Sequence, residues 1–274
     1  MPMSWCWRQV PAAATVPYAV SLTGTDLHED LATGERGPLI HAVLQAAGAI
    51  VTQNALTAAT LRRDFAPWAT KLHLVPPAVT LGSAPFPLRE RLALPADGTV
   101  FLHPAGIRPV KCNLELLLLF DPLASAQPAC SVVFCGPPLD PAYAARFQAA
   151  LADRPWARYL GVVPPEAMAA VLRAADVVLN HSQSEGLPNA LLEAAVLGRP
   201  ILARDIPGNA AVVHSGENGL LYRSDDEFLR HARALLSDPA LRERLSTPAP
   251  GQYRREDEAR ALEALLRPLV QIEP

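Results

Sequence analysis

Between residues 99 and 222, short apolar runs rich in β-branched residues alternate with longer stretches rich in Ala and Leu. The short runs are typical of buried strands, and the longer stretches have the apolar spacing of helices. This alternation predicts right-handed βαβ units and a parallel sheet, an α/β fold of the doubly wound type. Strands are expected at 99–103, 130–136, 157–161, 176–182, 200–204 and 218–223, with helices at 113–120, 141–152, 166–174, 189–197 and 209–214.

The start of the chain repeats this pattern over a shorter length. Strands are expected at 16–24, 48–53 and 71–79, with helices at 37–47 and 54–65 between them. Three strands and two helices make up about half of a Rossmann unit. The expected organisation is a partial Rossmann-like domain (1–80), a linker rich in Pro and Gly (81–98), a complete Rossmann-like domain (99–253) and a terminal amphipathic helix (254–274).

Composition excludes several classes of protein. The chain has 274 residues, is half hydrophobic and carries a net charge of −3, so it lacks the basic surface of a nucleic-acid-binding protein. No apolar run reaches the roughly 20 residues of a membrane span, and the N-terminus lacks a signal-peptide pattern. The cysteines Cys6, Cys112, Cys130 and Cys135 show no metal-binding spacing. A cytoplasmic chain without a metal site is expected.

The loop after strand 99–103 predicts an anion site. In "HPAGIRPVKCN" (103–113), Gly106 allows a tight turn, and Arg108 and Lys111 lie three residues apart before a helix that begins near Asn113. Two cations beside the positive end of a helix dipole suit a diphosphate. The alternative is a solvated basic loop. Lys111 is one of only two lysines, which favours the functional interpretation.

The loop after strand 176–182 carries carboxylates. Glu185 lies in "QSEGL" (183–187), ahead of Pro188, and Glu193 lies inside the following helix. A carboxylate near a helix start can bind the two hydroxyls of a ribose, and Gly186 lets the backbone approach a phosphate. Each glutamate alone is more simply a carboxylate favoured by the helix dipole. Together with the cationic loop, they predict a nucleotide-sugar site.

Three segments resemble a known family. "SEGLPNALLEAAVLGRPILA" (184–203) resembles the E-x7-E signature of the retaining glycosyltransferases of family 4, which have the GT-B fold of two Rossmann-like domains. "AGIRPVK" (105–111) resembles their diphosphate-binding loop, and "IPGNAAVVHSGENGLLY" (206–222) the segment that follows. The resemblance implies transfer of a sugar from a nucleoside diphosphate, most often UDP, to an acceptor hydroxyl with retention and without a metal. The nucleotide sugar is a substrate, and no cofactor is implied.

The resemblance also implies roles for individual residues. Glu193 would bind the ribose, Glu185 with Gly186 and Leu187 the donor sugar, and Arg108 with Lys111 the leaving diphosphate. Ser184, Asn189 and Gly106 complete the implied binding set. In "TGTD" (23–26), Thr23 replaces the usual His, and Asp26 remains as a candidate catalytic residue or a helix N-cap. His103 and His181 are interpreted as packed strand ends.

The short N-terminal part departs from the family. A member of the family begins with a full acceptor-binding domain, so the chain is expected to be truncated at its N-terminus, with impaired transfer. Two alternatives stay open. One is a GT-B epimerase or sugar synthase with the same donor half. The other is a non-catalytic isoform that binds a nucleotide sugar, or that forms a homo- or hetero-dimer through the exposed half-domain.

Overall fold

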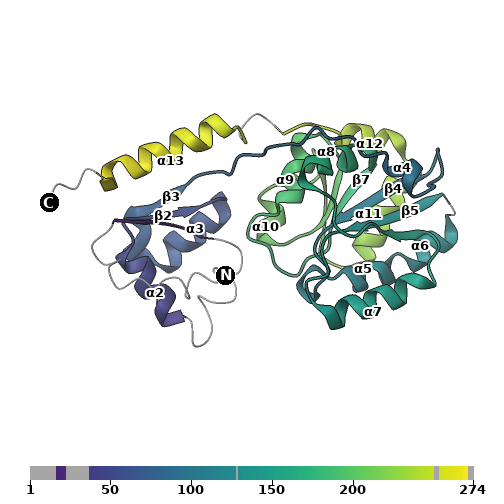
Figure 1. Cartoon of the computed structure of the whole chain (residues 1–274), viewed down its shortest axis with the longest axis horizontal. Coiled ribbons are helices and arrows are strands. Elements are labelled where there is room, and N and C mark those ends of the chain that lie inside the picture. Colours follow the sequence, from purple (N-terminus) through teal and green to yellow (C-terminus); the bar gives the residue numbers. More distant parts are fainter. Residues whose placement is uncertain (1–16, 23–36, 128, 250–252, 271–274) are drawn as a thin grey trace. The chain divides into compact units, whose positions relative to one another are not determined.

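The computed structural model describes residues 17–22, 37–127, 129–249 and 253–270. The chain divides into two compact units, the first comprising residues 1–78, 185–187 and 252–274, and the second residues 79–184 and 188–251. Each unit is built on its own parallel sheet (Figure 1). The α/β fold class predicted from the alternating pattern is therefore confirmed.

The second unit contains a six-stranded sheet in the order β6-β5-β4-β7-β8-β9, and every neighbouring pair is parallel. The chain proceeds outward from β4 to β5 and β6, then returns to the other side of β4 to add β7, β8 and β9. The strands are β4 (Thr99–Pro104), β5 (Cys130–Cys135), β6 (Ala157–Tyr159), β7 (Val177–Asn180), β8 (Ile201–Arg204) and β9 (Gly219–Tyr222). The topological switch point thus lies between β4 and β7.

Helices cover both faces of this sheet, with α8 and α9 opposite α5 and α7 in Figure 1. They are α4 (Leu88–Arg91), η4 (Pro109–Lys111), α5 (Asn113–Leu119), α6 (Asp121–Ala126), α7 (Pro141–Ala152), α8 (Pro165–Ala174), α9 (Asn189–Val196), α10 (Pro207–Ala210), α11 (Asp225–Ser237) and α12 (Pro239–Leu245). The prediction of a helix at 209–214 is wrong, because a single helical turn begins at Pro207 and ends at Ala210. Helices α4, α6, α11 and α12 were not predicted.

The core on the α5 side is an aromatic cluster. Phe120 contacts Phe101 of β4 and Phe228 of α11, each at 5.2 Å between ring centroids and edge to face. Such pairs contribute about 0.5–1.5 kcal/mol beyond the burial of their area. All three rings are fully buried. This packing fixes α5 and α11 on the sheet, and with α5 the loop that precedes it.

Residues 81–98, expected to form a linker, belong to the second unit and include α4. Arg89 forms an ion pair with Asp176 at 2.7 Å, and Asp176 also accepts a hydrogen bond from the Val100 amide at 2.8 Å. The Ala84 amide donates to the Glu166 carbonyl at 2.9 Å. These contacts anchor the segment beside the start of β4.

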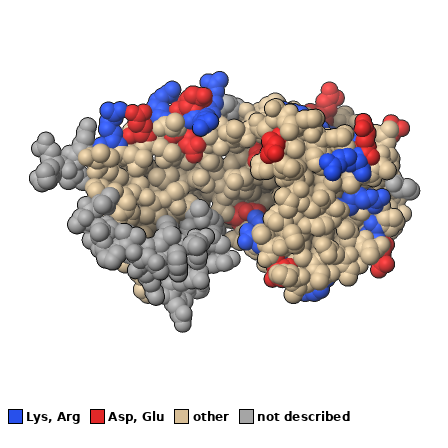
Figure 2. All heavy atoms as spheres, viewed as in Figure 1, with Lys and Arg blue, Asp and Glu red and all other residues tan. Residues whose placement is uncertain are grey.

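The first unit contains β1 (Ala19–Ser21), β2 (Ala49–Thr52) and β3 (Leu72–Leu74), parallel and in that order. Its helices are α2 (Gly37–Ala46), α3 (Ala55–Asp64), η3 (Ala66–Lys71) and α13 (Arg255–Val270). Leu269 of α13 packs so closely on Gly48 that a Cβ there would lie 2.6 Å from it. Acidic and basic side chains alternate along α13 in Figure 2. Within this helix, Arg260 pairs with Asp257 at 3.3 Å.

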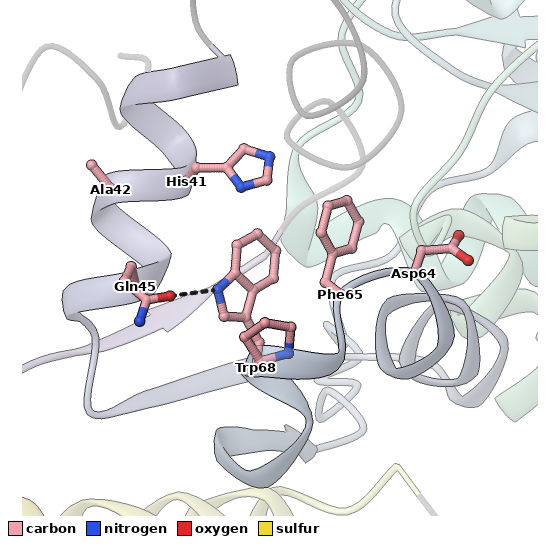
Figure 3. A pocket seen from close by; sticks show the side chains of 7 residues that line it. His41, Ala42, Gln45, Asp64, Phe65 and Trp68 are labelled. Carbon is pink, nitrogen blue, oxygen red and sulfur yellow. Dashed lines mark hydrogen bonds between the residues drawn. The ribbon is translucent and has the colours of Figure 1, made fainter.

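A cavity of about 410 Å³ opens in the first unit between α2 and the end of α3 (Figure 3). Phe65 stacks on Trp68 with 4.6 Å between the ring centroids, and the Trp68 Nε1–H donates to Gln45 at 3.3 Å. The cavity is lined by His41, Ala42, Gln45, Asp64, Phe65, Pro67 and Trp68. None of the predicted site residues belongs to this lining.

Among the described residues, no helix has both the length and the apolar content needed to cross a membrane.

Candidate functional site

Two loops meet at the switch point of the second unit. One follows β4 and the other follows β7, and these strands are hydrogen-bonded neighbours whose carboxyl ends lie at the same edge. The Gln183 amide donates to the Val110 carbonyl at 2.9 Å, which joins the two loops directly. Ligands of open α/β sheets bind outside the carboxyl ends of the strands at such a point. The two predicted loops therefore lie side by side at this edge of the sheet.

The loop after β4 follows a fixed course. The Ala105 amide donates to the Cys135 carbonyl and the Ile107 amide to the Pro137 carbonyl, both at 2.8 Å. Gly106 was expected to make a tight turn, but its backbone is not left-handed. A Cβ on Gly106 would instead lie 2.6 Å from the Leu139 side chain, so close approach explains this glycine. The left-handed residue of the loop is Cys112, with φ 51°.

Both predicted cations lie in this loop. Arg108 is half-buried and precedes η4, which ends at Lys111, and the Lys111 amide donates to the Arg108 carbonyl at 3.0 Å. The Arg108 Nε is buried and has no hydrogen-bond partner among the described residues. Helix α5 then begins without a side-chain cap. Cationic side chains and uncapped amides together favour an anion.

The loop after β7 leads into α9. Ser184, Glu185, Gly186 and Leu187 are half-buried. Pro188 is the N-cap of α9, which begins at Asn189 as predicted. Residues 185–187 belong to the first unit. Asn189 is exposed at the first position of the helix, and no side chain caps it. The start of α9 thus offers backbone N–H groups at the switch point.

Glu193 lies farther along α9 and is half-buried. Burial raises the pKa of its carboxyl group, and no described Lys or Arg forms an ion pair with it. Burial, followed by the charge of Glu193, raises the pKa of Cys135 to about 12. Cys135 ends β5, so the Glu193 carboxyl lies near the carboxyl edge of the sheet. A carboxylate in this setting can accept hydrogen bonds from hydroxyl groups of a ligand.

A series of hydrogen-bonded polar side chains lies at the same edge of the sheet, and the sequence analysis identified only its histidines. His103 and His181 are 1% and 3% exposed, which confirms that they are packed strand ends. His181 nevertheless contacts two polar partners: its Nδ1 lies 2.5 Å from the Tyr222 hydroxyl, and its Nε2 lies 3.0 Å from the Arg204 Nη2. Arg204 ends β8 and was missed by the sequence interpretation.

The state of His181 gives a test of this packing. Burial, and then the charges of Arg204 and His103, lower the pKa of His181 to about 3. In the unfolded chain the His181 imidazole takes up a proton near pH 6.5, whereas in the folded chain it stays neutral at that pH. The free energy of unfolding therefore falls as the pH drops below 6.5. We expect the free energy of unfolding to fall by about 1 kcal/mol per pH unit between pH 6 and 5, relative to His181→Gln. Urea unfolding of both proteins measures this difference, and parallel pH curves would contradict the buried neutral state.

The other candidates carry less information. Asp26 and Thr23 lie outside the described residues. Within the described part of the chain, no group of three His, Cys, Asp or Glu side chains could hold a metal ion. Cys112, Cys130 and Cys135 are free and buried. The described candidate site residues therefore lie in the loops after β4 and β7, in α9 and at the end of β8.

Comparison with known proteins identifies related sequences. The family Glycosyl transferases group 1 matches residues 87–252. Glycosyltransferase 1 domain-containing protein 1 of Xenopus tropicalis is 28% identical over 251 residues, which cover 85% of this chain and 70% of that protein. D-inositol 3-phosphate glycosyltransferase of Jonesia denitrificans is 28% identical over 224 residues, 76% of this chain and 53% of that enzyme. The chain thus spans about half the length of the latter relative.

Solved structures show the same fold. Anabaena Alr3699/HepE, in complex with UDP and glucose, superposes with a TM-score of 0.77 at 17% identity, over 93% of this chain and 72% of that one. Sucrose-phosphate synthase from Thermosynechococcus elongatus gives a TM-score of 0.78 at 20% identity, over 98% of this chain and 72% of that one. The fold of the chain is of the Rossmann-like GT-B type, as the sequence predicted.

Proposed function

Because the chain belongs to the Glycosyl transferases group 1 family, we propose that it moves a sugar from a nucleoside-diphosphate donor, with UDP as the first candidate, to an acceptor hydroxyl with retention of configuration. Support for a UDP-sugar comes from the relative Anabaena Alr3699/HepE, whose structures contain UDP, glucose or UDP-glucose. The donor would bind at the switch point of the second unit. The acceptor stays unassigned.

The observation that carries this proposal is the junction of the two loops. The hydrogen bond from Gln183 to Val110 joins the cationic turn to the loop that leads into α9, at the carboxyl edge of the sheet. In the proposed complex, Arg108 and Lys111 bind the donor diphosphate and Glu193 binds the ribose. Glu185 and the backbone of Gly186 and Leu187 bind the sugar. Gly106, which has no side chain, leaves space for the donor, and Ser184 and Asn189 form hydrogen bonds with it.

Arg108 and Lys111 act on the reaction electrostatically. When the bond between the sugar and the diphosphate breaks, negative charge develops on the leaving oxygen. Fixed cations at Arg108 and Lys111 stabilise that charge in the transition state more than in the ground state, and this difference accelerates the reaction. The acceptor hydroxyl then forms the new bond on the face that the leaving group occupied, and its proton passes to the departing diphosphate.

Binding of UDP is the first test. We expect saturable binding by calorimetry with a Kd of about 1–1000 µM, the range of ordinary KM values for substrates. GDP, ADP and UDP-sugars titrated in parallel identify the base and the sugar. Arg233→Gln removes an exposed charge on α11 and serves as a control for a general change in protein charge. A folded chain that binds none of these nucleotides would contradict the proposal.

Product analysis then separates the enzymatic alternatives. A transferase releases UDP and gives a glycoside with the anomeric configuration of the donor, which proton NMR detects. An epimerase changes the sugar of the donor in the absence of an acceptor. Binding without any turnover over a panel of sugar and polyol acceptors would favour a non-catalytic binding protein.

A further inference from the structure

The carboxyl ends of β7, β8 and β9 carry a chain of hydrogen bonds that ends on Arg204. An arginine guanidinium can only donate, so the His181 Nε2, 3.0 Å from the Arg204 Nη2, must accept. The His181 Nδ1 therefore bears the proton and donates to the Tyr222 hydroxyl at 2.5 Å. The Tyr222 O–H is left to donate to the Asn180 carbonyl, 3.5 Å away. One assignment of protons satisfies all three contacts.

The positive charge of Arg204 is not balanced by a carboxylate. Among the described residues, no Asp or Glu forms an ion pair with this half-buried guanidinium. The neighbouring Asp205 does not serve, because it pairs with Arg223 at 2.6 Å. The imidazole that receives the Arg204 hydrogen bond is neutral, since burial keeps the pKa of His181 at about 3. A partly buried, uncompensated cation favours an anion beside it.

Arg204 lies beside the loop that follows β7: it ends β8, which pairs with β7, and its Nη2 lies 3.0 Å from His181, the residue directly after β7. Burial, and then the charge of Glu115, raise the pKa of the Cys112 thiol, and the charge of Arg204 opposes this rise, in agreement with that position. The Cys112 thiol also interacts with the Gln183 side chain. The end of β8 therefore joins the loops after β4 and β7 at the switch point.

We propose that Arg204 is a third cation of the donor site and contacts the diphosphate of a bound nucleoside diphosphate together with Arg108 and Lys111. His181 and Tyr222 are positioning residues, which hold the guanidinium in one orientation. This inference rests on the donor site of the proposed function. It adds Arg204, at the end of a third strand, to the site. This residue lies outside both the cationic loop (103–113) and the E-x7-E segment (184–203).

The test compares ligands with and without the diphosphate. Arg204→Gln is expected to weaken UDP about 10-fold and to leave uridine unchanged, because the lost contact is a charge-assisted hydrogen bond to phosphate. Arg204→Lys keeps the charge but loses the planar fork, so an intermediate loss is expected. Arg233→Gln is the control, because it removes an exposed cation on α11, away from the strand ends, and should change neither ligand.

Tyr222→Phe tests the positioning role. This variant removes the hydroxyl that accepts from the His181 Nδ1 and that also interacts with the Arg204 side chain. The imidazole proton can then shift to Nε2, which no longer accepts from Arg204, so the guanidinium loses its fixed orientation. We expect UDP to weaken about 3-fold with uridine unchanged. Calorimetry at 50 and 200 mM salt should show a weaker salt dependence of UDP binding for Arg204→Gln than for Tyr222→Phe, because only the former loses a charge.

The outcomes separate this inference from the proposed function. If the unaltered chain binds UDP and Arg204→Gln binds it equally well, the inference is wrong and the donor site stands. An equal loss of UDP and uridine in Arg204→Gln and Arg204→Lys would assign Arg204 a purely structural role, which also overturns the inference. If the unaltered chain binds no nucleotide, the proposed function itself fails.

Discussion

Replacing Lys111 by alanine is expected to slow the release of UDP from a UDP-sugar about 100-fold. Removing one group that stabilises transition-state charge typically costs 10²- to 10³-fold in kcat. Lys111 ends η4, directly ahead of α5, where the positive end of the helix reinforces its effect on an anion. The fall is expected in kcat more than in KM, because charge on the leaving oxygen develops only as the bond breaks.

Hydrolysis of the donor allows this measurement without a known acceptor, since water replaces the acceptor hydroxyl. Lys111→Arg keeps the positive charge and is expected to stay within about 10-fold of the unaltered chain. Lys71→Met provides the matched control, because Lys71, the other lysine of the chain, only donates to the carbonyls of Gln45 and Ala47. Unchanged turnover in Lys111→Ala would remove this residue from the mechanism.

Strands were predicted well because their physical signal is local. In β5 (Cys130–Cys135) every residue is buried, as a strand covered on both faces must be, and the sequence accordingly reads as a continuous apolar run. The predicted strand boundaries differ by one or two residues in the second unit, as at β7, where 176–182 became Val177–Asn180. There the ladder ends at Asn180, and the predicted last residues, His181 and Ser182, are buried beyond the end of the strand.

The missed helices divide into two kinds. Helix α11 had a readable start: Ser224 caps the Glu227 amide at 3.2 Å, and Phe228, Ala232 and Leu235 form a buried stripe. Helix α6 had none, because it follows α5 directly through Phe120 and no loop residue separates the two.

The site was predictable only where it is continuous in sequence. The cationic loop and the glutamates each lie within one βα connection, so spacing was enough to find them. Arg204 and His181 are 23 residues apart, and His181 and Tyr222 are 41 apart. Their contacts exist because β7, β8 and β9 are neighbours in the sheet. A single charged residue at a strand end gives no sign of this before the strand order is known.

Replacing Glu193 by glutamine should weaken UDP about 10-fold or more, whereas Glu185→Gln should spare UDP and weaken only the UDP-sugar. Hydrogen bonds to a charged group contribute about 1.5–3 kcal/mol, so losing the ribose contact corresponds to at least a tenfold rise in Kd. Glu185 is proposed to contact only the sugar, which UDP lacks. Calorimetry of the two ligands with the two variants gives the four values that decide this division of roles.

Stability separates the loss of a contact from a damaged fold. Because burial raises the pKa of Glu193, the folded chain binds its proton more readily than the unfolded chain, and ionisation at neutral pH therefore destabilises the fold. A neutral amide removes that cost, so Glu193→Gln is expected to keep or raise the Tm at pH 7 while it loses UDP. Glu243→Gln, on the exposed side of α12, is the control and should change neither property. Equal losses of UDP and UDP-sugar in both site variants would contradict separate ribose and sugar contacts, and a lower Tm in Glu193→Gln would indicate that this carboxylate stabilises the fold.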